Sequence, residues 1–213
     1  MLEIHNLRAW YGQVQALFGV SLSVGRGELV VLQGLNGAGK STLLQAIMGI
    51  GPRVDGVVRY QGASILELPS HQRALRGLGY VPEDRRLFTA LTVRENLLIA
   101  ARRGSASVLA QRQEQVLALF PALKGMLGRS AAHMSGGEQQ MLAIARTLMA
   151  GPSLLLLDEP CEGISPVLVE SIRDALLSLK AQGIPMLVAE QNGVLTARAD
   201  RVITLTAQTP LDA

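Results

Sequence analysis

Short apolar runs, separated by glycine-containing turns, dominate the first third of the chain. These runs cover residues 2–7, 20–24 and 29–33. Apolar runs of this length bounded by turn residues predict β-strands. Residues 57–60 and 63–66 flank Gln61 and Gly62 and predict a β-hairpin. We therefore expect an antiparallel group of strands near the N-terminus.

In the middle of the chain the apolar residues recur at helical spacing. Thr92 and Glu95 form a capping-box pattern directly before the apolar residues 97–99. Residues 107–120 can form a second helix. The stretch from about residue 90 to about residue 150 is therefore a candidate helical subdomain.

The last third of the chain alternates between strand and helix patterns. Four consecutive leucines, 154–157, predict a fully buried strand. Apolar residues at helical spacing between 168 and 179 predict a helix, and residues 186–189 and 201–205 predict two more strands. Strands joined by crossover helices form a parallel sheet, so we expect an α/β fold with a mainly parallel core sheet.

Composition limits the classes of protein to which the chain can belong. Its 213 residues suit one domain, 1–213, and no apolar stretch approaches the roughly 20 residues of a membrane-spanning helix. Residues 1–5 lack the features of a secretory signal, and the single cysteine, Cys161, cannot form an internal disulfide, so we expect a cytosolic setting. Scattered basic residues and 3% aromatics argue against nucleic acid as a partner.

A glycine-rich segment after the third predicted strand matches the phosphate-loop pattern G-x-x-x-x-G-K-[ST]. Such glycines let backbone N–H groups point inward, the lysine reaches the terminal phosphates, and the serine hydroxyl can bind Mg²⁺. A chance match would arise in about one in a hundred chains of this length. The residues that we expect to contact the nucleotide are Gly34, Asn36, Gly37, Ala38, Gly39, Lys40, Ser41 and Thr42.

Two carboxylates follow the four leucines. Asp158 and Glu159 would lie at the carboxyl edge of the parallel sheet, where α/β folds bind ligands. Adjacent side chains of an extended segment point in opposite directions, so only one need face a metal. We expect Asp158 to hold Mg²⁺, through water, and Glu159 to orient or deprotonate the attacking water. The alternative is a solvated strand end.

The segment Ser135-Gly136-Gly137-Glu138-Gln139 precedes a predicted helix. Ser135 and Glu138 form a second capping-box pattern, which is a sufficient local role for them. It does not account for Gly136 and Gly137, because glycine lowers helix stability unless the backbone must approach something closely.

Together the three segments resemble those of the ATP-binding cassette (ABC) ATPases. The resemblance implies a P-loop NTPase fold with an N-terminal antiparallel β subdomain and an inserted helical subdomain. In that family the serine and glycines that match Ser135, Gly136 and Gly137 bind the γ-phosphate of ATP held by the other subunit of a head-to-tail dimer. ATP and Mg²⁺ are the implied cofactors.

Three further positions match by order and context. Tyr11 resembles the aromatic residue that stacks on adenine, although a core or edge tyrosine is an equal alternative. Glu83 stands where the family usually has a glutamine that touches Mg²⁺, and Gln191 stands where it usually has a switch histidine. Glutamine cannot carry a proton near neutral pH. The implied catalytic set is therefore Glu159, with Lys40 and Gln191 in support.

Residues 83–88 and 158–166 resemble the branch that serves branched-chain amino-acid importers and their urea or amide relatives. This implies an ATPase at the cytoplasmic face of the inner membrane, with two transmembrane permease subunits, a second ABC ATPase of identical or different sequence, and an external solute-binding protein as partners. Two alternatives stay open. One is a soluble cassette ATPase, for example in metal-cluster assembly; the other is a weakly hydrolysing nucleotide-binding module, suggested by Gln191 and Ser165.

Overall fold

A computed structural model describes residues 1–101, 105–191 and 193–206. The first strands form an antiparallel sheet in the order β2-β1-β4-β5. Its strands are β1 (Leu2–Tyr11), β2 (Val14–Val24), β4 (Arg53–Tyr60) and β5 (Ala63–Ser64). The predicted antiparallel group and hairpin are confirmed, although the second hairpin strand is only two residues long.

Strand β1 shows how an irregularity keeps an apolar face on the core. Leu2 and Ile4 are buried, and so are Leu7 and Ala9. Ile4 and Leu7 are three positions apart, so in a regular strand they would point to opposite faces. The register of β1 shifts between Ile4 and Leu7, and Asn6 has a φ of 49°. A β-bulge of this kind absorbs one residue, so both pairs point to the same side.

The second sheet has the order β6-β7-β8-β3-β9, and all of its pairings are parallel, as predicted. Its strands are β3 (Leu29–Gln33), β6 (Leu78–Val81), β7 (Leu154–Asp158), β8 (Met186–Glu190) and β9 (Arg201–Thr204). Strands β7 and β8 are buried at every residue, as expected of central parallel strands covered on both faces.

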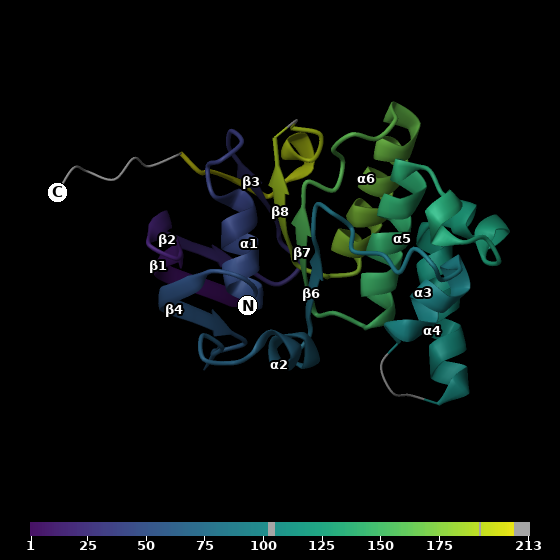
Figure 1. The fold of residues 1–213 in the computed structure, drawn as a ribbon, viewed down its shortest axis with the longest axis horizontal. Helices are drawn as coiled ribbons and strands as arrows, with labels where there is room; N and C mark the ends of the chain where they lie inside the picture. Colours follow the sequence, from purple (N-terminus) through teal and green to yellow (C-terminus); the bar gives the residue numbers. More distant parts are fainter. Residues whose placement is uncertain (102–104, 192, 207–213) are drawn as a thin grey trace.

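Helix α1 (Lys40–Met48) lies between the two sheets, and α5 (Gly136–Met149) and α6 (Pro166–Ala181) cover the other face of the parallel sheet (Figure 1). Apolar side chains accordingly form two clusters, one on each face of that sheet. The short helix α2 (Ser70–Leu75) leads into β6. Short 3₁₀ helices cover Pro121–Met126, Ala131–His133 and Thr196–Arg198.

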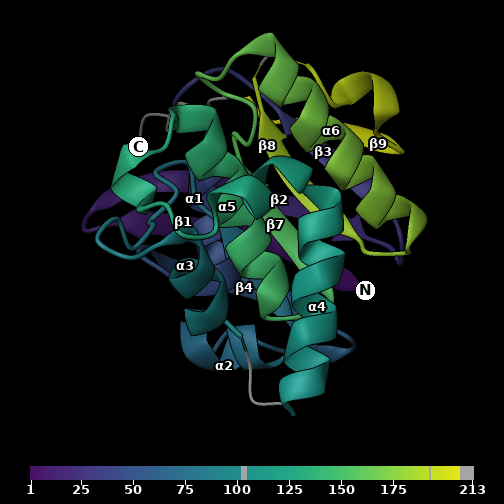
Figure 2. The same ribbon diagram turned by 90° about the vertical axis from the view of Figure 1, so that its right-hand side faces the viewer.

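Helices α3 (Val93–Ile99) and α4 (Ala106–Leu119) pack on α5, on the side away from the sheet (Figure 2). The Thr92–Glu95 capping box is formed, with the Thr92 N–H donating to Glu95 Oε2 at 2.8 Å. Buried side chains of α3, α4 and α5 belong to the same cluster as those of β7 and β8. None of the helices in the described ranges is long and apolar enough to cross a membrane.

Candidate nucleotide site

The glycine-rich segment joins β3 to α1 and adopts backbone conformations that glycine favours. Gly37 and Gly39 have φ angles of 82° and 93°. A Cβ at Gly39 would lie 2.7 Å from Leu17 Cδ2, so a larger residue there would have to displace the Leu17 side chain of β2. Within the described residues, no side chain caps the first turn of α1. Its N–H groups and the positive end of the helix dipole are therefore available to an anion.

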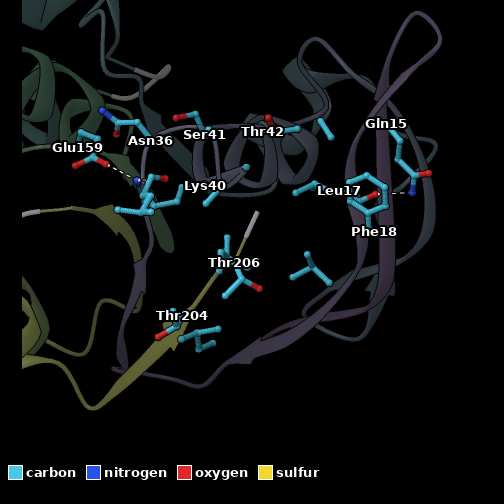
Figure 3. A pocket seen from close by; sticks show the side chains of 18 of the residues that line it. Gln15, Leu17, Phe18, Asn36, Lys40, Ser41, Thr42, Glu159, Thr204 and Thr206 are labelled. Carbon is cyan, nitrogen blue, oxygen red and sulfur yellow. Dashed lines mark hydrogen bonds and ion pairs between the residues drawn. The ribbon is translucent and has the colours of Figure 1, made fainter. Parts of the chain in front are cut away.

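The Lys40 side chain is buried and its ammonium group is held by oxygen atoms. Lys40 Nζ lies 2.7 Å from the Gly34 carbonyl oxygen and 3.1 Å from Glu159 Oε1. Lys40 Nζ and Glu159 Oε1 form an ion pair, but their orientation does not meet the geometry of a hydrogen bond. A phosphate group would offer this ammonium a stronger partner. The predicted phosphate lysine and the predicted catalytic carboxylate are therefore in direct contact (Figure 3).

Asp158 is buried beside the first turn of α1. Ser41 Oγ donates to Asp158 Oδ1 at 2.9 Å, and the Tyr80 hydroxyl donates to Asp158 Oδ2 at 3.3 Å. Burial raises the pKa of this carboxyl to about 6, and Glu83 and Glu159 add to the rise, while the two hydrogen bonds oppose it. A cation beside Asp158 would relieve that cost.

The oxygen atoms near Asp158 are of the kind that Mg²⁺ prefers. A serine hydroxyl and carboxylates are hard donors, and Ser41, Asp158 and Glu83 line one small cavity of about 310 Å³. In the part of the chain that the structure describes, no three acidic, histidine or cysteine side chains group as a metal site. The residues therefore fit Mg²⁺ only if phosphate oxygens and water complete its ligands.

Glu159 has a left-handed backbone, with a φ of 44°. Its N–H donates to the Ala189 carbonyl oxygen at 3.0 Å, and its Oε2 accepts from the Gln191 N–H at 3.0 Å. Strained backbone at a non-glycine residue persists where the surroundings fix it, as β8 does here. Asp158 lies near Ser41 and Glu159 near Lys40, but because the backbone at Glu159 is left-handed, this separation is not the alternation of an extended strand on which the prediction relied.

A cavity of about 710 Å³ lies in front of these groups. The glycine-rich loop and Glu159 form one side, and Gln15, Leu17 and Phe18 of β2 form the opposite side (Figure 3). Thr204 and Thr206 close it from the end of β9. Phe18 was not singled out in the sequence; an aromatic residue in β2, two strands before the phosphate loop, is the signal that could have drawn attention to it.

Tyr11 is not among the residues that line this cavity. Its side chain is 44% exposed, and its hydroxyl donates to Gln45 Oε1 at 2.8 Å. Stacking of Tyr11 on adenine therefore stays a prediction. Gln191 is exposed and contacts Glu159 through its backbone N–H, so the role of its side chain also stays a prediction.

Ser135, Gly136 and Gly137 lie at the N-terminus of α5 and do not line the cavity of their own chain. Their capping box is formed, with the Ser135 N–H donating to Glu138 Oε2 at 2.7 Å. A Cβ at Gly137 would overlap the Leu168 side chain, so this glycine has a packing reason within the chain. The three atoms nearest to a Cβ at Gly136 belong to the Arg85 guanidinium, the closest at 3.4 Å.

A second buried carboxyl and the cysteine lie near Glu159. Glu190 Oε2 accepts from the Leu195 N–H at 2.9 Å, and burial raises the pKa of this carboxyl. Burial likewise raises the pKa of the Cys161 thiol to about 12, so it carries no thiolate at neutral pH. Cys161 is therefore not a nucleophile at neutral pH.

Comparison with known proteins agrees with this geometry. Residues 17–162 match the family described as ABC transporter. The chain is 42% identical over 206 residues to the high-affinity branched-chain amino acid transport ATP-binding protein BraG of Pseudomonas aeruginosa, covering 96% of this chain and 88% of BraG. It is 38% identical over 193 residues to the probable branched-chain amino acid transport ATP-binding protein LivF of Archaeoglobus fulgidus, covering 90% and 82%.

Among solved structures, the chain superimposes on the ATP-binding cassette MJ0796 with a TM-score of 0.84 at 27% identity. That structure is a dimeric post-hydrolysis state bound to ADP and Pi, and the match covers 97% of this chain and 95% of that one. The P-loop NTPase fold with its antiparallel N-terminal sheet is thus confirmed. The chain belongs to the ABC transporter family, as one of its ATPase cassettes.

Proposed function

We propose that this cassette binds and hydrolyses ATP to drive uptake of branched-chain amino acids, or of a related small polar solute, through partner permeases. The observation that carries the ATPase proposal is the contact of Lys40, at 3.1 Å, with Glu159 beside the Ser41–Asp158 pair. The solute is inferred from BraG and LivF, which are both named as branched-chain amino acid transport proteins.

The phosphates would bind at the N-terminus of α1. The uncapped N–H groups and the glycine-rich loop surround them, and Lys40 exchanges Glu159 and the Gly34 carbonyl for phosphate oxygens. Ser41, Asp158 and Glu83 would hold Mg²⁺, which supplies charge neutralisation on the phosphates when bound.

Glu159 would orient the attacking water. Its Oε2 is fixed by the Gln191 N–H, and its Oε1 becomes available once Lys40 turns to the phosphates. The water oxygen then bonds to the γ-phosphorus, the bond from that phosphorus to the bridging oxygen breaks, and the water proton passes to Glu159 or to the released phosphate. Catalysis here depends on positioning and electrostatics.

We also propose that a second cassette, with the same or a different sequence, covers the bound ATP. Ser135, Gly136 and Gly137 line no cavity with their own Lys40, and the MJ0796 relative is dimeric. The further proposed partners are two transmembrane permease subunits and, indirectly, an external solute-binding protein. The cassette would thus act at the cytoplasmic face of the membrane. Nothing in the site favours nucleic acid or metal-cluster assembly.

The direct test is ATP hydrolysis by wild type and by Glu159→Gln. We expect the variant to keep ATP affinity within about twofold and to lose hydrolysis by about 10²–10⁴-fold, the range for removal of a general base. Glu170→Gln, an exposed position on α6, is the control and should hydrolyse as wild type does. Undiminished hydrolysis by E159Q would contradict the assignment.

A second experiment addresses transport. Deleting the chain in its host should abolish uptake of labelled leucine, and wild type, but not E159Q, should restore it. The chain should also co-purify with integral membrane subunits from solubilised membranes. Normal leucine uptake in the deletion strain, together with loss of uptake of another solute, would keep the ATPase and refute the branched-chain amino-acid assignment.

A further inference from the structure

A row of polar side chains extends from Asp158 to Tyr11. The Tyr80 hydroxyl donates to Asp158 Oδ2 at 3.3 Å. The Gln45 side chain lies beside Tyr80, and both residues line the same cavity of about 310 Å³. Gln45 Oε1 in turn accepts from the Tyr11 hydroxyl at 2.8 Å. Four elements far apart in sequence, namely β7, β6, α1 and β1, thus contribute to one polar row.

Tyr80 would keep Asp158 oriented when a metal is bound. Asp158 is 1% exposed, and each of its carboxylate oxygens accepts one hydroxyl, from Ser41 or from Tyr80. Ser41 is also the expected metal ligand, so its hydroxyl oxygen would turn to Mg²⁺. Tyr80 then remains as the donor that fixes the carboxylate. Partners of this kind set the orientation of metal-binding carboxylates.

Tyr80 is suited to this role by its surroundings. Its phenol hydroxyl is a hydrogen-bond donor, and it already points at the Asp158 carboxylate. Tyr80 and Gln45 also line the 310 Å³ cavity that contains Ser41, Glu83 and Asp158. Both therefore border the space where the metal is expected, without being metal ligands.

We propose that Tyr80 and Gln45 are positioning residues, through which the metal-binding carboxylate Asp158 is held in place and linked to Tyr11. This inference rests on the proposed function, in that Asp158 must serve the Mg²⁺ of the bound nucleotide. Loss of the Tyr80 hydroxyl should therefore change the metal concentration that hydrolysis needs. Through Gln45, a change at Tyr11, the aromatic residue expected at the adenine, should alter the same concentration.

The first experiment compares Tyr80→Phe with Tyr60→Phe. Each removes one tyrosine hydroxyl, and Tyr60 lies in the antiparallel sheet, where its hydroxyl accepts from Gln61 Nε2 at 3.3 Å. The measurements are the Mn²⁺ concentration that half-activates hydrolysis at saturating ATP, and the ATP affinity in EDTA. We expect Y80F to raise the half-activating Mn²⁺ concentration about tenfold, the lower end of the range for outer-shell partners, with ATP affinity in EDTA unchanged.

The controls separate the two proposals. Y60F should match wild type in both measurements. A change below about threefold in Y80F, or an equal change in Y60F, overturns the positioning role. If wild type binds no ATP, the proposed function is overturned and this inference with it. If wild type binds and hydrolyses ATP, and Y80F needs the same Mn²⁺ concentration as wild type, only the inference is overturned.

The second experiment tests the link through Gln45. Gln45→Met keeps the size of the side chain and removes its hydrogen bonds, and Tyr11→Phe keeps the ring. We expect Y11F to raise the half-activating Mn²⁺ concentration about twofold in wild type and to have no effect in the Q45M background, as coupled residues show non-additive effects. Equal effects of Y11F in both backgrounds would overturn the link. Q45M also tests the row if Y80F does not fold.

Discussion

The N-termini of α1 and α5 are built differently, although both belong to segments expected to contact phosphate. Helix α1 begins after Gly39, with no side-chain cap and no acidic residue in its first turn. Helix α5 begins after Ser135, whose capping box places Glu138 in the first turn. A carboxylate already offsets the positive end of α5, whereas α1 presents it to the cavity.

This difference indicates that the two helix N-termini have different roles in nucleotide binding. The α1 terminus, with Lys40, Ser41, Asp158 and Glu159 around it, is suited to hold an anion and a metal within one chain. The α5 terminus can add a hydroxyl and N–H groups, but too little positive charge to hold a triphosphate by itself. It fits a surface that closes over a nucleotide already bound elsewhere.

The largest expected effect is at α1. Lys40→Met should weaken ATP binding by about 100-fold, because a charged hydrogen bond to phosphate contributes roughly 1.5–3 kcal/mol and Glu159 would be left buried beside the anion. Isothermal titration calorimetry would measure this. Lys124→Met, at an exposed lysine, should bind as wild type does. If K40M binds ATP as tightly as wild type does, the α1 terminus is not the main phosphate-binding site, and the proposed difference between the two helices is wrong.

The far end of α1 offers the next effect. The buried Arg73 guanidinium donates to the carbonyl oxygens of Ala46 and Ile47 at 2.9 and 2.8 Å, and to those of Leu66 and Leu68. Arg73→Met leaves these acceptors unpaired and should lower the free energy of unfolding by about 3 kcal/mol. Urea denaturation would show the loss. A stability unchanged in R73M would mean that α1 is fixed by apolar packing alone.

The charge on Asp158 gives a pH dependence in the absence of metal. Its pKa of about 6 lies above the ordinary 3.8, so the folded protein binds the proton more tightly than the unfolded chain does. Stability should therefore fall as pH rises from about 4 to about 6, by roughly 1.4 kcal/mol per pH unit at most. Asp158→Asn should remove this slope in thermal melts while abolishing Mg²⁺-dependent hydrolysis. An identical slope in D158N would assign it to another group.

The smallest effect on stability separates two equivalent caps. Ser135→Ala and Thr92→Ala each break a capping box and should each cost about 1 kcal/mol of unfolding free energy. Only S135A should also reduce ATP-dependent dimerisation and hydrolysis. Size-exclusion chromatography with E159Q as the background, which holds ATP uncleaved, would measure dimerisation. Equal loss in T92A would reduce the role of Ser135 to helix capping.

Much of the fold follows from local pattern. The strand runs, both capping boxes and the phosphate loop between β3 and α1 depend on residues close together in sequence, and the structure contains each of them, although the strand predicted at 63–66 ends at Ser64. Other features depend on partners that are remote in sequence. Arg73 is buried because carbonyls at the end of α1 need donors, and Gly137 is small because Leu168 of α6 packs against it.

The loop after β6 shows the same limit. Arg85 and Arg86 have φ angles of 61° and 47°, and Arg146 of α5 donates to both of their carbonyl oxygens. The Arg85 side chain returns to Gln139 and Gln140 near the start of α5. No pattern within residues 83–88 indicates this clamp, because the donors that stabilise the left-handed backbone lie some 60 residues later in the chain.

The sequence by itself determined the chemistry, since a phosphate loop, two carboxylates after a buried strand and a capped glycine pair are each readable from neighbouring residues. Only the tertiary structure decided which of these groups meet. Lys40 contacts Glu159, and Ser41 and Tyr80 both contact Asp158. Tyr11 contacts Gln45 and does not line the nucleotide cavity. The physical reason is that contacts across a parallel sheet are set by strand order and register, which bring Lys40 and Ser41, just after β3, to Glu159 and Asp158, more than 100 positions later.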